Sequence, residues 1–242
     1  PKHELPDNLS WGPDKWDEDY RDNNRINCYE TGTSPCKVAC PAHIAVQGYI
    51  RKAKEGKYRE ALELIKKDNP FPAICGRVCN KRCEAACTRG TIDEAVAIDD
   101  IKKFIAEQDL HAETRFVPEV VIPSNVDKQW SEKIAIIGAG PAGLSCAYYL
   151  ATKGYKPTVF EKNARPGGML TYGIPSYKLE KDVIEAEIDV LRELGVEIKC
   201  GVNVGTDVTI DELRKQGYKA FYVAIRSEGG RRAEGQLCRI CG

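Results

Sequence analysis

Cysteine is the residue type whose number and placement point most directly to chemistry in this sequence. The chain has 242 residues and 11 cysteines, and seven of these fall between Cys28 and Cys87. A secreted disulfide scaffold would be shorter and would follow an export signal, and no apolar signal segment opens this sequence. In a reducing compartment clustered thiols more often hold metal, with disulfides and unrelated thiols as the alternatives. The clustering predicts a metal or iron–sulfur site and a cytoplasmic location.

The clustered cysteines form two groups with regular spacing. These are Cys28-x7-Cys36-x3-Cys40, followed by Pro41, and Cys75-x3-Cys79-x3-Cys83-x3-Cys87. A cysteine followed by proline closes the ligand run of bacterial ferredoxins. In one continuous helix, successive cysteines of the second group would lie about 6 Å apart along the axis, and the first and last about 18 Å apart. One cluster could not bind all four thiolates over that length, so we expect breaks in the helix at Gly76 and Asn80. Structural zinc sites favour C-x2-C pairs, which this block lacks, so the spacing favours [4Fe–4S] over zinc.

A glycine motif lies in the second half of the chain. It comprises Gly138, Ala139, Gly140, Pro141, Ala142 and Gly143. An apolar run over 133–137 predicts a strand before it, and a helix is expected over 142–153. Glycines here allow a tight turn and a close approach to a pyrophosphate, and Glu161 follows about 20 residues on, where an acid binds a ribose. The pattern predicts dinucleotide binding, with an ordinary glycine turn as the alternative.

A second glycine-rich stretch follows Glu161. Its candidate cofactor-binding residues are Lys162, Gly167, Gly168, Met169, Leu170, Gly173 and Ile174. Paired glycines would let the backbone run close to the ribityl chain of a flavin. Cys146 and Cys200 each stand alone, which excludes the close redox pair of flavoprotein disulfide reductases and favours core thiols.

Two regions with different patterns of apolar residues must position these candidate site residues. Apolar spacing predicts helices over 44–53, from Tyr58 to the Asn69–Pro72 stop, and over 95–110. Strand–helix alternation then predicts a parallel sheet with strands over 133–137, 157–160, 196–199 and 220–225. The fold class expected is an α-helical iron–sulfur domain followed by an incomplete α/β Rossmann-like FAD-binding domain. The expected divisions are an arm (1–27), a helical domain (28–115), a linker (116–131) and the FAD domain (132–242).

The balance of charge excludes some partners. Lys and Arg total 36, as do Asp and Glu, so the formal net charge is zero. A general nucleic-acid binder would show a basic excess. No apolar run approaches the roughly 18 residues of a membrane-spanning helix. We therefore expect neither a nucleic-acid partner nor a membrane span.

The motifs together resemble a known family. Residues 28–225 are similar to the small (beta) subunit of NADPH-dependent glutamate synthase and its relatives, including the N-terminal part of dihydropyrimidine dehydrogenase. The supporting stretches are SPCKVACPAHIAVQGYI, FPAICGRVCNKRCEAAC, AVAIDDIKKFIAEQ, IAIIGAGPAGLSCAYYLA, VFEKNARPGGMLTYGIP and YKLEKDVIEAEIDVL. The resemblance implies two [4Fe–4S] clusters, FAD and NAD(P)H. No second GxGxxG follows, so the nicotinamide domain is missing and we expect a fragment.

The resemblance also implies a ligand set. Cys40, Cys79, Cys83 and Cys87 match one cluster, and Cys28 and Cys36 match two ligands of the other. The family's first cysteine falls near Arg25 and its Glu or Gln ligand near Lys102, so Cys75 is the candidate substitute. Val204 is expected to touch the adenine.

The function expected from these matches is electron transfer. Electrons would pass from NAD(P)H through FAD to the clusters and on to an electron-acceptor subunit or a ferredoxin-like protein. The protein groups bind and tune cofactors, and no catalytic acid or base is required. The alternatives are a non-catalytic cluster-bearing relay module without a nicotinamide site, and a zinc-stabilised binding protein.

Overall fold

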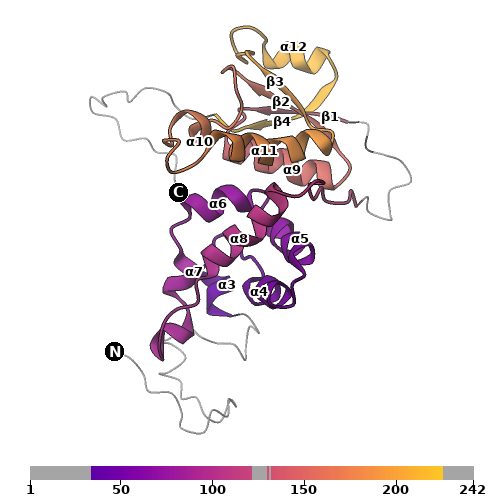
Figure 1. Ribbon diagram of the computed structural model, residues 1–242. Coiled ribbons are helices and arrows are strands. Elements are labelled where there is room, and N and C mark those ends of the chain that lie inside the picture. The colour runs from indigo at the N-terminus through magenta and orange to yellow at the C-terminus, as the bar shows by residue number, and fades with distance from the viewer. Residues whose placement is uncertain (1–33, 122–129, 131, 226–242) are drawn as a thin grey trace, which may run out of the picture.

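The structure is a computed structural model that describes residues 34–121, 130 and 132–225. A helical part and a sheet part lie one above the other (Figure 1). The expected arm (1–27) and Cys28 lie outside the described residues. The domain boundaries expected at 27, 115 and 131 stay predictions.

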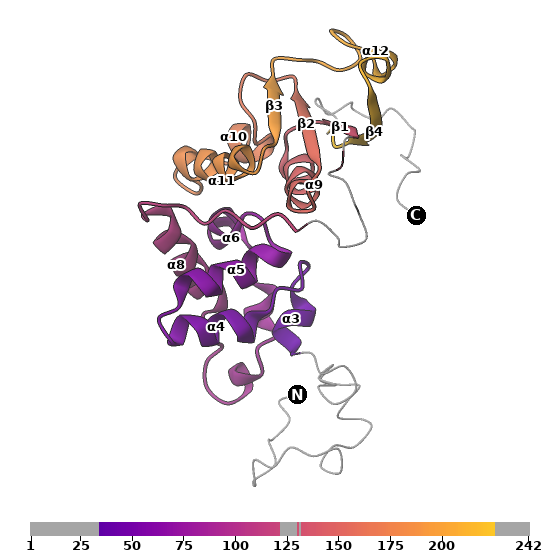
Figure 2. The same cartoon turned by 90° about the vertical axis from the view of Figure 1, so that its right-hand side faces the viewer.

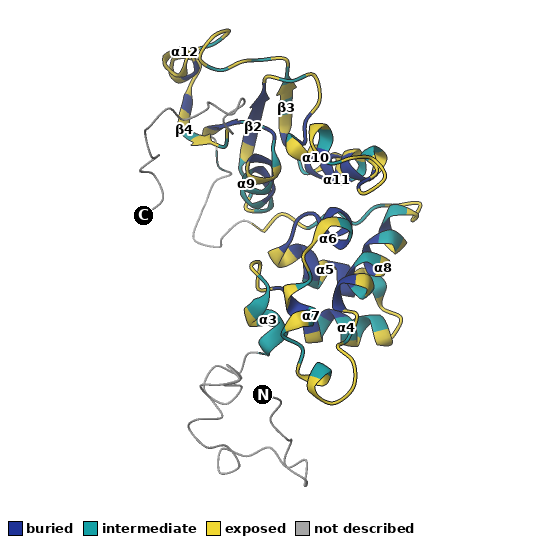
Figure 3. Cartoon of the chain, turned by 90° about the vertical axis from the view of Figure 1, so that its left-hand side faces the viewer, coloured by how far each residue is buried: buried dark blue, intermediate teal, exposed yellow. Residues whose placement is uncertain are grey.

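The helical part contains short helices built around one core. Its elements are α3 (Pro35–Ala39), α4 (Val46–Lys54), α5 (Tyr58–Asp68), α6 (Pro72–Val78), α7 (Arg82–Ala85), η2 (Thr88–Thr91) and α8 (Ile98–Leu110). The predicted helices are confirmed, although the third begins at Ile98 and not at Ala95. Tyr49, Ile65 and Ile105 are each at most 1% exposed. Burial is concentrated in α5, α6 and α8, whereas α3 has no buried residue (Figure 3).

The break predicted at Gly76 is wrong. Gly76 lies inside α6, and a Cβ added there would come within 2.9 Å of the Lys103 Cα. This glycine therefore lets α6 pack closely against α8. The chain leaves the helix at Cys79, and Asn80 and Lys81 form the break, where Lys81 adopts a left-handed φ of 55°.

Four parallel strands form the sheet of the described residues, in the order β3-β2-β1-β4. The strands are β1 (Lys133–Ile137), β2 (Lys156–Glu161), β3 (Glu197–Cys200) and β4 (Tyr218–Val223). The helices are α9 (Pro141–Thr152), α10 (Met169–Tyr172), α11 (Lys181–Glu193) and α12 (Ile210–Lys215). Ile137 pairs with Phe160 on one side and with Val223 on the other, so the strands end at one edge. The predicted parallel sheet is confirmed.

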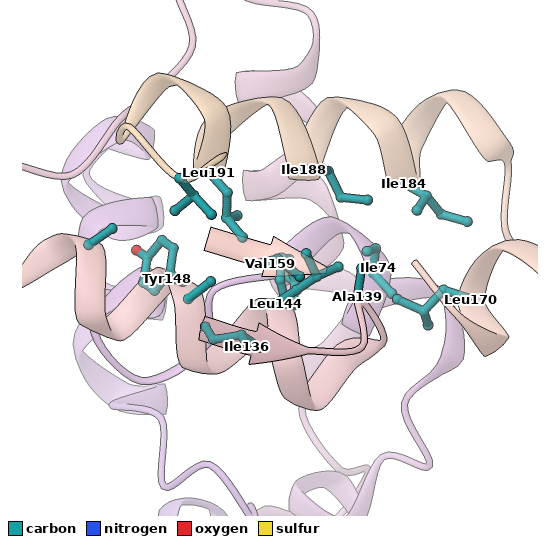
Figure 4. Packing of buried hydrophobic residues seen from close by; sticks show 14 of the residues in the cluster. Ile74, Ile136, Ala139, Leu144, Tyr148, Val159, Leu170, Ile184, Ile188 and Leu191 are labelled. Carbon is teal, nitrogen blue, oxygen red and sulfur yellow. The ribbon is translucent and has the colours of Figure 1, made fainter. Parts of the chain in front are cut away.

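The two parts share a hydrophobic core through α6. Figures 1 and 2 both place α6 against the side of the sheet part that carries α9 and α11. Phe71 and Ile74 belong to the same buried cluster as the sheet residues Ile136 and Val159. Ile74 points into this core near Ala139 (Figure 4). Burying each such side chain stabilises the fold by about 1.5–3 kcal/mol, so the helical part does not pack independently of the sheet.

Polar contacts at this interface are also buried. The Lys66 Nζ lies 3.6 Å from Glu187 Oε2, and both side chains are 1% exposed. Glu187 Oε1 accepts a hydrogen bond from Ala73 N at 3.1 Å, and Tyr148 donates to the Lys66 carbonyl at 3.0 Å. Burial raises the pKa of Glu187, and the Lys66 charge opposes that rise. This pair joins α5 and α6 to α11.

Among the helices that the structure describes, none is long and apolar enough to cross a membrane.

Candidate cofactor sites

The first glycine motif lies where β1 ends and α9 begins. Gly138 has a φ of +106°, and a Cβ there would lie 2.6 Å from the Ala224 carbonyl oxygen. A Cβ on Gly143 would overlap the Gly138 carbonyl oxygen. Both positions therefore require glycine, the first for the turn and the second for packing of α9 on the loop. Pro141 and Ala142 form the exposed first turn of α9.

Gly140 differs from its two neighbours in the motif. A Cβ on Gly140 would meet no protein atom within 4 Å, and its φ of −77° suits any residue. Gly140 is the N-cap of α9 and supplies no capping side chain. The free N–H groups and the positive end of the helix dipole favour an anion at this position. The open space above Gly140 therefore leaves room for an anionic group at the N-terminus of α9.

The second glycine stretch contacts the first. Gly167 N donates to the Ala139 carbonyl at 2.7 Å. A Cβ on Gly168 would lie 2.9 Å from the Gly140 Cα. Both Gly167 and Gly168 have positive φ, of 108° and 54°. The two loops are therefore in direct contact at the N-terminus of α9.

Glu161 ties the first loop to the end of β2. Its carboxylate is buried and accepts hydrogen bonds from Ala139 N at 2.8 Å, Asn163 N at 3.0 Å and Asn163 Nδ2 at 2.8 Å. A carboxylate has about four acceptor positions, so these contacts leave capacity for a further donor. Its ribose role stays a prediction. Lys162 follows on the exposed side.

The remaining candidates differ in placement. Met169 is 46% exposed and Leu170 is buried. The Lys181 ammonium donates to the Leu170 carbonyl at 3.1 Å and to the Ile174 carbonyl at 2.7 Å. Lys181 thus holds the loop that contains Gly173, and nothing in its spacing marks it in the sequence. Val204 packs in a separate small cluster with Phe160 and Tyr218, and its adenine contact stays a prediction.

Three of the predicted cluster ligands line one cavity in the helical part. Cys40 follows α3, Cys79 ends α6 and Cys83 lies in α7, and all three thiols are free. Tyr49, Lys102 and Arg82 are among the other residues that line it. The resemblance implied that these cysteines share a cluster, and the structure brings three of the four implied ligands to one cavity from two groups far apart in the chain.

The other predicted ligands lie outside that lining. Cys87 follows α7 and is half-buried. The Cys36 thiol donates to Ser34 Oγ at 3.2 Å, and the Cys75 thiol lies 3.6 Å from Asn69 Oδ1. Within residues 34–121, 130 and 132–225, no three His, Cys, Asp or Glu side chains are arranged as a metal site. The ligand assignments, including that of Cys28, stay predictions.

The electrostatics of the cavity bear on metal binding. Burial raises the pKa of the Cys83 thiol to about 11, and the Lys102 charge acts in the opposite direction. Burial also raises the pKa of Cys75, again against Lys102. Burial alone would lower the pKa of Lys102, but its hydrogen bond to Asp99 and the Asp99 charge raise it. A metal must bind thiolates, so a cation in the wall makes the thiols better ligands.

The donor chemistry fits an iron–sulfur cluster. Soft thiolates suit Fe–S clusters, and a Cys-Pro pair stands at Cys40. Bacterial [4Fe–4S] sites use this thiolate chemistry, and the cavity offers three cysteines beside a cation.

Family models match both parts. Residues 16–114 match dihydropyrimidine dehydrogenase domain II, 4Fe–4S cluster, and residues 136–183 match an NAD(P)-binding Rossmann-like domain. The fold and these matches define the class as an iron–sulfur domain followed by a Rossmann-like dinucleotide-binding domain.

Comparison with individual proteins then identifies the family within this class. The chain is 41% identical over 209 residues to the NADP(+)-dependent formate dehydrogenase subunit beta of Moorella thermoacetica, covering 79% of this chain and 29% of that protein. It is 37% identical over 194 residues to the NADPH-Fe(3+) oxidoreductase subunit beta of Geobacter sulfurreducens (79% and 28%). It is 38% identical over 200 residues to the glutamate synthase [NADPH] small chain of Escherichia coli (82% and 41%).

The chain is therefore homologous to the glutamate synthase small chain and to related oxidoreductase beta subunits, and the resemblance seen in the sequence is confirmed. It spans 28% to 41% of the length of these three relatives.

Proposed function

We propose that this chain is the iron–sulfur and FAD-binding part of an NAD(P)H-dependent oxidoreductase. FAD would bind over Gly138–Gly143 and beside Gly167–Gly168. A [4Fe–4S] cluster would bind to Cys40, Cys79, Cys83 and Cys87. A partner subunit or a ferredoxin-like protein would receive the electrons.

One observation carries the dinucleotide half of this proposal. The Gly168 turn packs on Gly140, and no protein atom fills the space above Gly140. A single phosphate loop would serve an ordinary dinucleotide, and the second glycine turn beside it supports a flavin, whose ribityl chain would run along that turn. The names of the relatives, which include NADPH-dependent oxidoreductases, support the same class of reaction.

The residues would bind and orient rather than transfer protons. The α9 N-terminus would hold the pyrophosphate, Glu161 the adenosine ribose, and Lys181 the shape of the loop beside the flavin. When bound, a flavin accepts a hydride as an electron pair, and iron–sulfur clusters carry single electrons. Because α6 ends at Cys79 and places Ile74 in the core near Ala139, α6 would connect the two sites.

The test is cofactor analysis of the chain purified without oxygen. We expect extractable FAD and equal amounts of iron and acid-labile sulfide. Extraction of NAD(P) without FAD would refute the flavin assignment, and stoichiometric zinc without iron would refute the cluster assignment.

A relay module without its own nicotinamide site is the second candidate. It would need only the cluster region, residues 16–114, which matches the 4Fe–4S family model. Stopped-flow mixing with NADPH or NADH separates the two. Rapid bleaching of the flavin in this chain supports the first function, and a flavin that only dithionite reduces supports the second.

A further inference from the structure

Lys102 is a buried cation in the wall of the cysteine cavity. It lies on α8, is 6% exposed, and lines the cavity together with Cys40, Cys79 and Cys83. A buried ammonium is costly unless it is paired. Burial of the Lys102 ammonium among thiols therefore costs folding free energy, which suggests that its charge has a function in the cavity.

Lys102 forms a buried ion pair with Asp99. Lys102 Nζ lies 2.5 Å from Asp99 Oδ1, one turn earlier on the same helix. Asp99 is 2% exposed, and its backbone N–H donates to Glu84 Oε1 at 2.9 Å. Lys102 lines the cavity with Cys40, Cys79 and Cys83, whereas Asp99 is not part of that lining. The ammonium therefore lies nearer to the thiols than its counter-charge, and the pair presents its positive end to them.

A positive field selects between the two states of a cluster held there. Reduction by one electron adds a negative charge to the cluster. In a poorly solvated cavity a fixed cation nearby stabilises that extra charge more than it would in water. The charge and hydrogen bonding around a cluster are known determinants of its potential.

We propose that the Lys102–Asp99 pair raises the reduction potential of the cluster bound at Cys40, Cys79 and Cys83. Lys102 is a tuning residue and not a ligand. This inference rests on the proposed function, since it requires a cluster in that cavity. It assigns an effect on the reduction potential to Lys102 and Asp99, neither of which is among the proposed cluster ligands.

The test compares Lys102→Met with Lys103→Met in the anaerobically purified chain. Methionine keeps the length and the apolar stem of the side chain and removes the charge. Lys103 is the adjacent residue, 40% exposed and paired with Glu107 at 3.8 Å, so it is the matched control. The midpoint potential is read by EPR during a redox titration, and iron content is measured on the same sample.

We expect Lys102→Met to lower the ratio of reduced to oxidised cluster about tenfold at a fixed potential, which is a fall of about 59 mV in the midpoint of a one-electron couple. Lys103→Met should leave the midpoint unchanged. An unchanged midpoint in Lys102→Met, with iron retained, would overturn the inference.

Lys102→Gln provides a second test that keeps a polar side chain. It removes the same charge, so the midpoint should fall as it does in Lys102→Met. If Lys102→Met does not fold, this variant decides alone: a midpoint equal to that of the wild type, with iron retained, contradicts the inference. A wild-type chain that holds no iron refutes the proposed cluster, whereas a cluster with insensitive potential refutes this inference alone.

Discussion

The glycine loop and the cysteine cavity are built in opposite ways. The loop uses contiguous backbone between β1 and α9, and its ligand contacts would come mainly from N–H groups and open space. The cavity uses side chains from α6, α7, α8 and the segment after α3. A site made of local backbone depends on which residues can adopt its turn. A site made of distant side chains depends on the packing that brings them together.

Replacement of Cys83 by Ser gives the largest effect that we expect on the cavity. Serine removes one soft ligand, so about four iron atoms per chain should be lost. Colorimetric iron and sulfide assays on anaerobic protein measure this. Cys146→Ser is the control, because Cys146 lies half-buried on α9 in the sheet part. Equal iron in wild type and Cys83→Ser would contradict the assignment of Cys83.

Replacement of Glu187 by Ala should affect both regions at once. It leaves Lys66 buried without its partner, which costs about 3–5 kcal/mol. Urea unfolding followed by circular dichroism should show one transition at lower denaturant. Glu180→Ala, which removes a half-exposed partner of Arg77, should cost at most about 1 kcal/mol. Two transitions, with the helical part unaffected by Glu187→Ala, would show that the regions fold separately.

Gly143→Ala tests the packing role of the third motif glycine. Its Cβ would overlap the Gly138 carbonyl oxygen, so the loop or α9 must move, at about 1–3 kcal/mol. Thermal unfolding should show the loss, and bound nucleotide should fall with it. Wild-type stability in this variant would mean that α9 can shift without cost.

Gly140→Ala should have the smallest effect on the fold. Its Cβ meets no protein atom, so stability should change by less than about 0.5 kcal/mol. Nucleotide retention should nevertheless fall, because the methyl group would occupy the space left for the phosphates. The two alanine variants therefore separate folding from binding. Full retention of nucleotide by Gly140→Ala would place the ligand elsewhere.

The fold class and the glycine loop could be predicted from residues close together in the sequence. Apolar periodicity predicted the strands around the loop, and the roles of Gly138 and Gly143 follow from local sterics. Gly76 shows the limit of such reasoning. Its spacing suggested a break, but the close approach of Lys103 on another helix keeps it inside α6.

Several residues at the sites could not be predicted from spacing. Lys181 is an ordinary helix lysine in the sequence, and only tertiary contacts place it on the Leu170 carbonyl. The resemblance marked the position of Lys102, but only the structure places its side chain in the cavity with Cys40, Cys79 and Cys83. The contact of Gly168 with Gly140 likewise requires the chain to return after β2. No local signal encodes such a return.

The sequence by itself determined where the strands, the glycine turns and the cysteine groups fall, because each depends on the conformations open to a few neighbouring residues. Tertiary structure decided which cysteines share a cavity, which lysine charges it, and that α6 joins the helical core to the sheet. Those outcomes depend on burial and charge pairing between segments far apart in the chain, and they exist only once the whole core has packed.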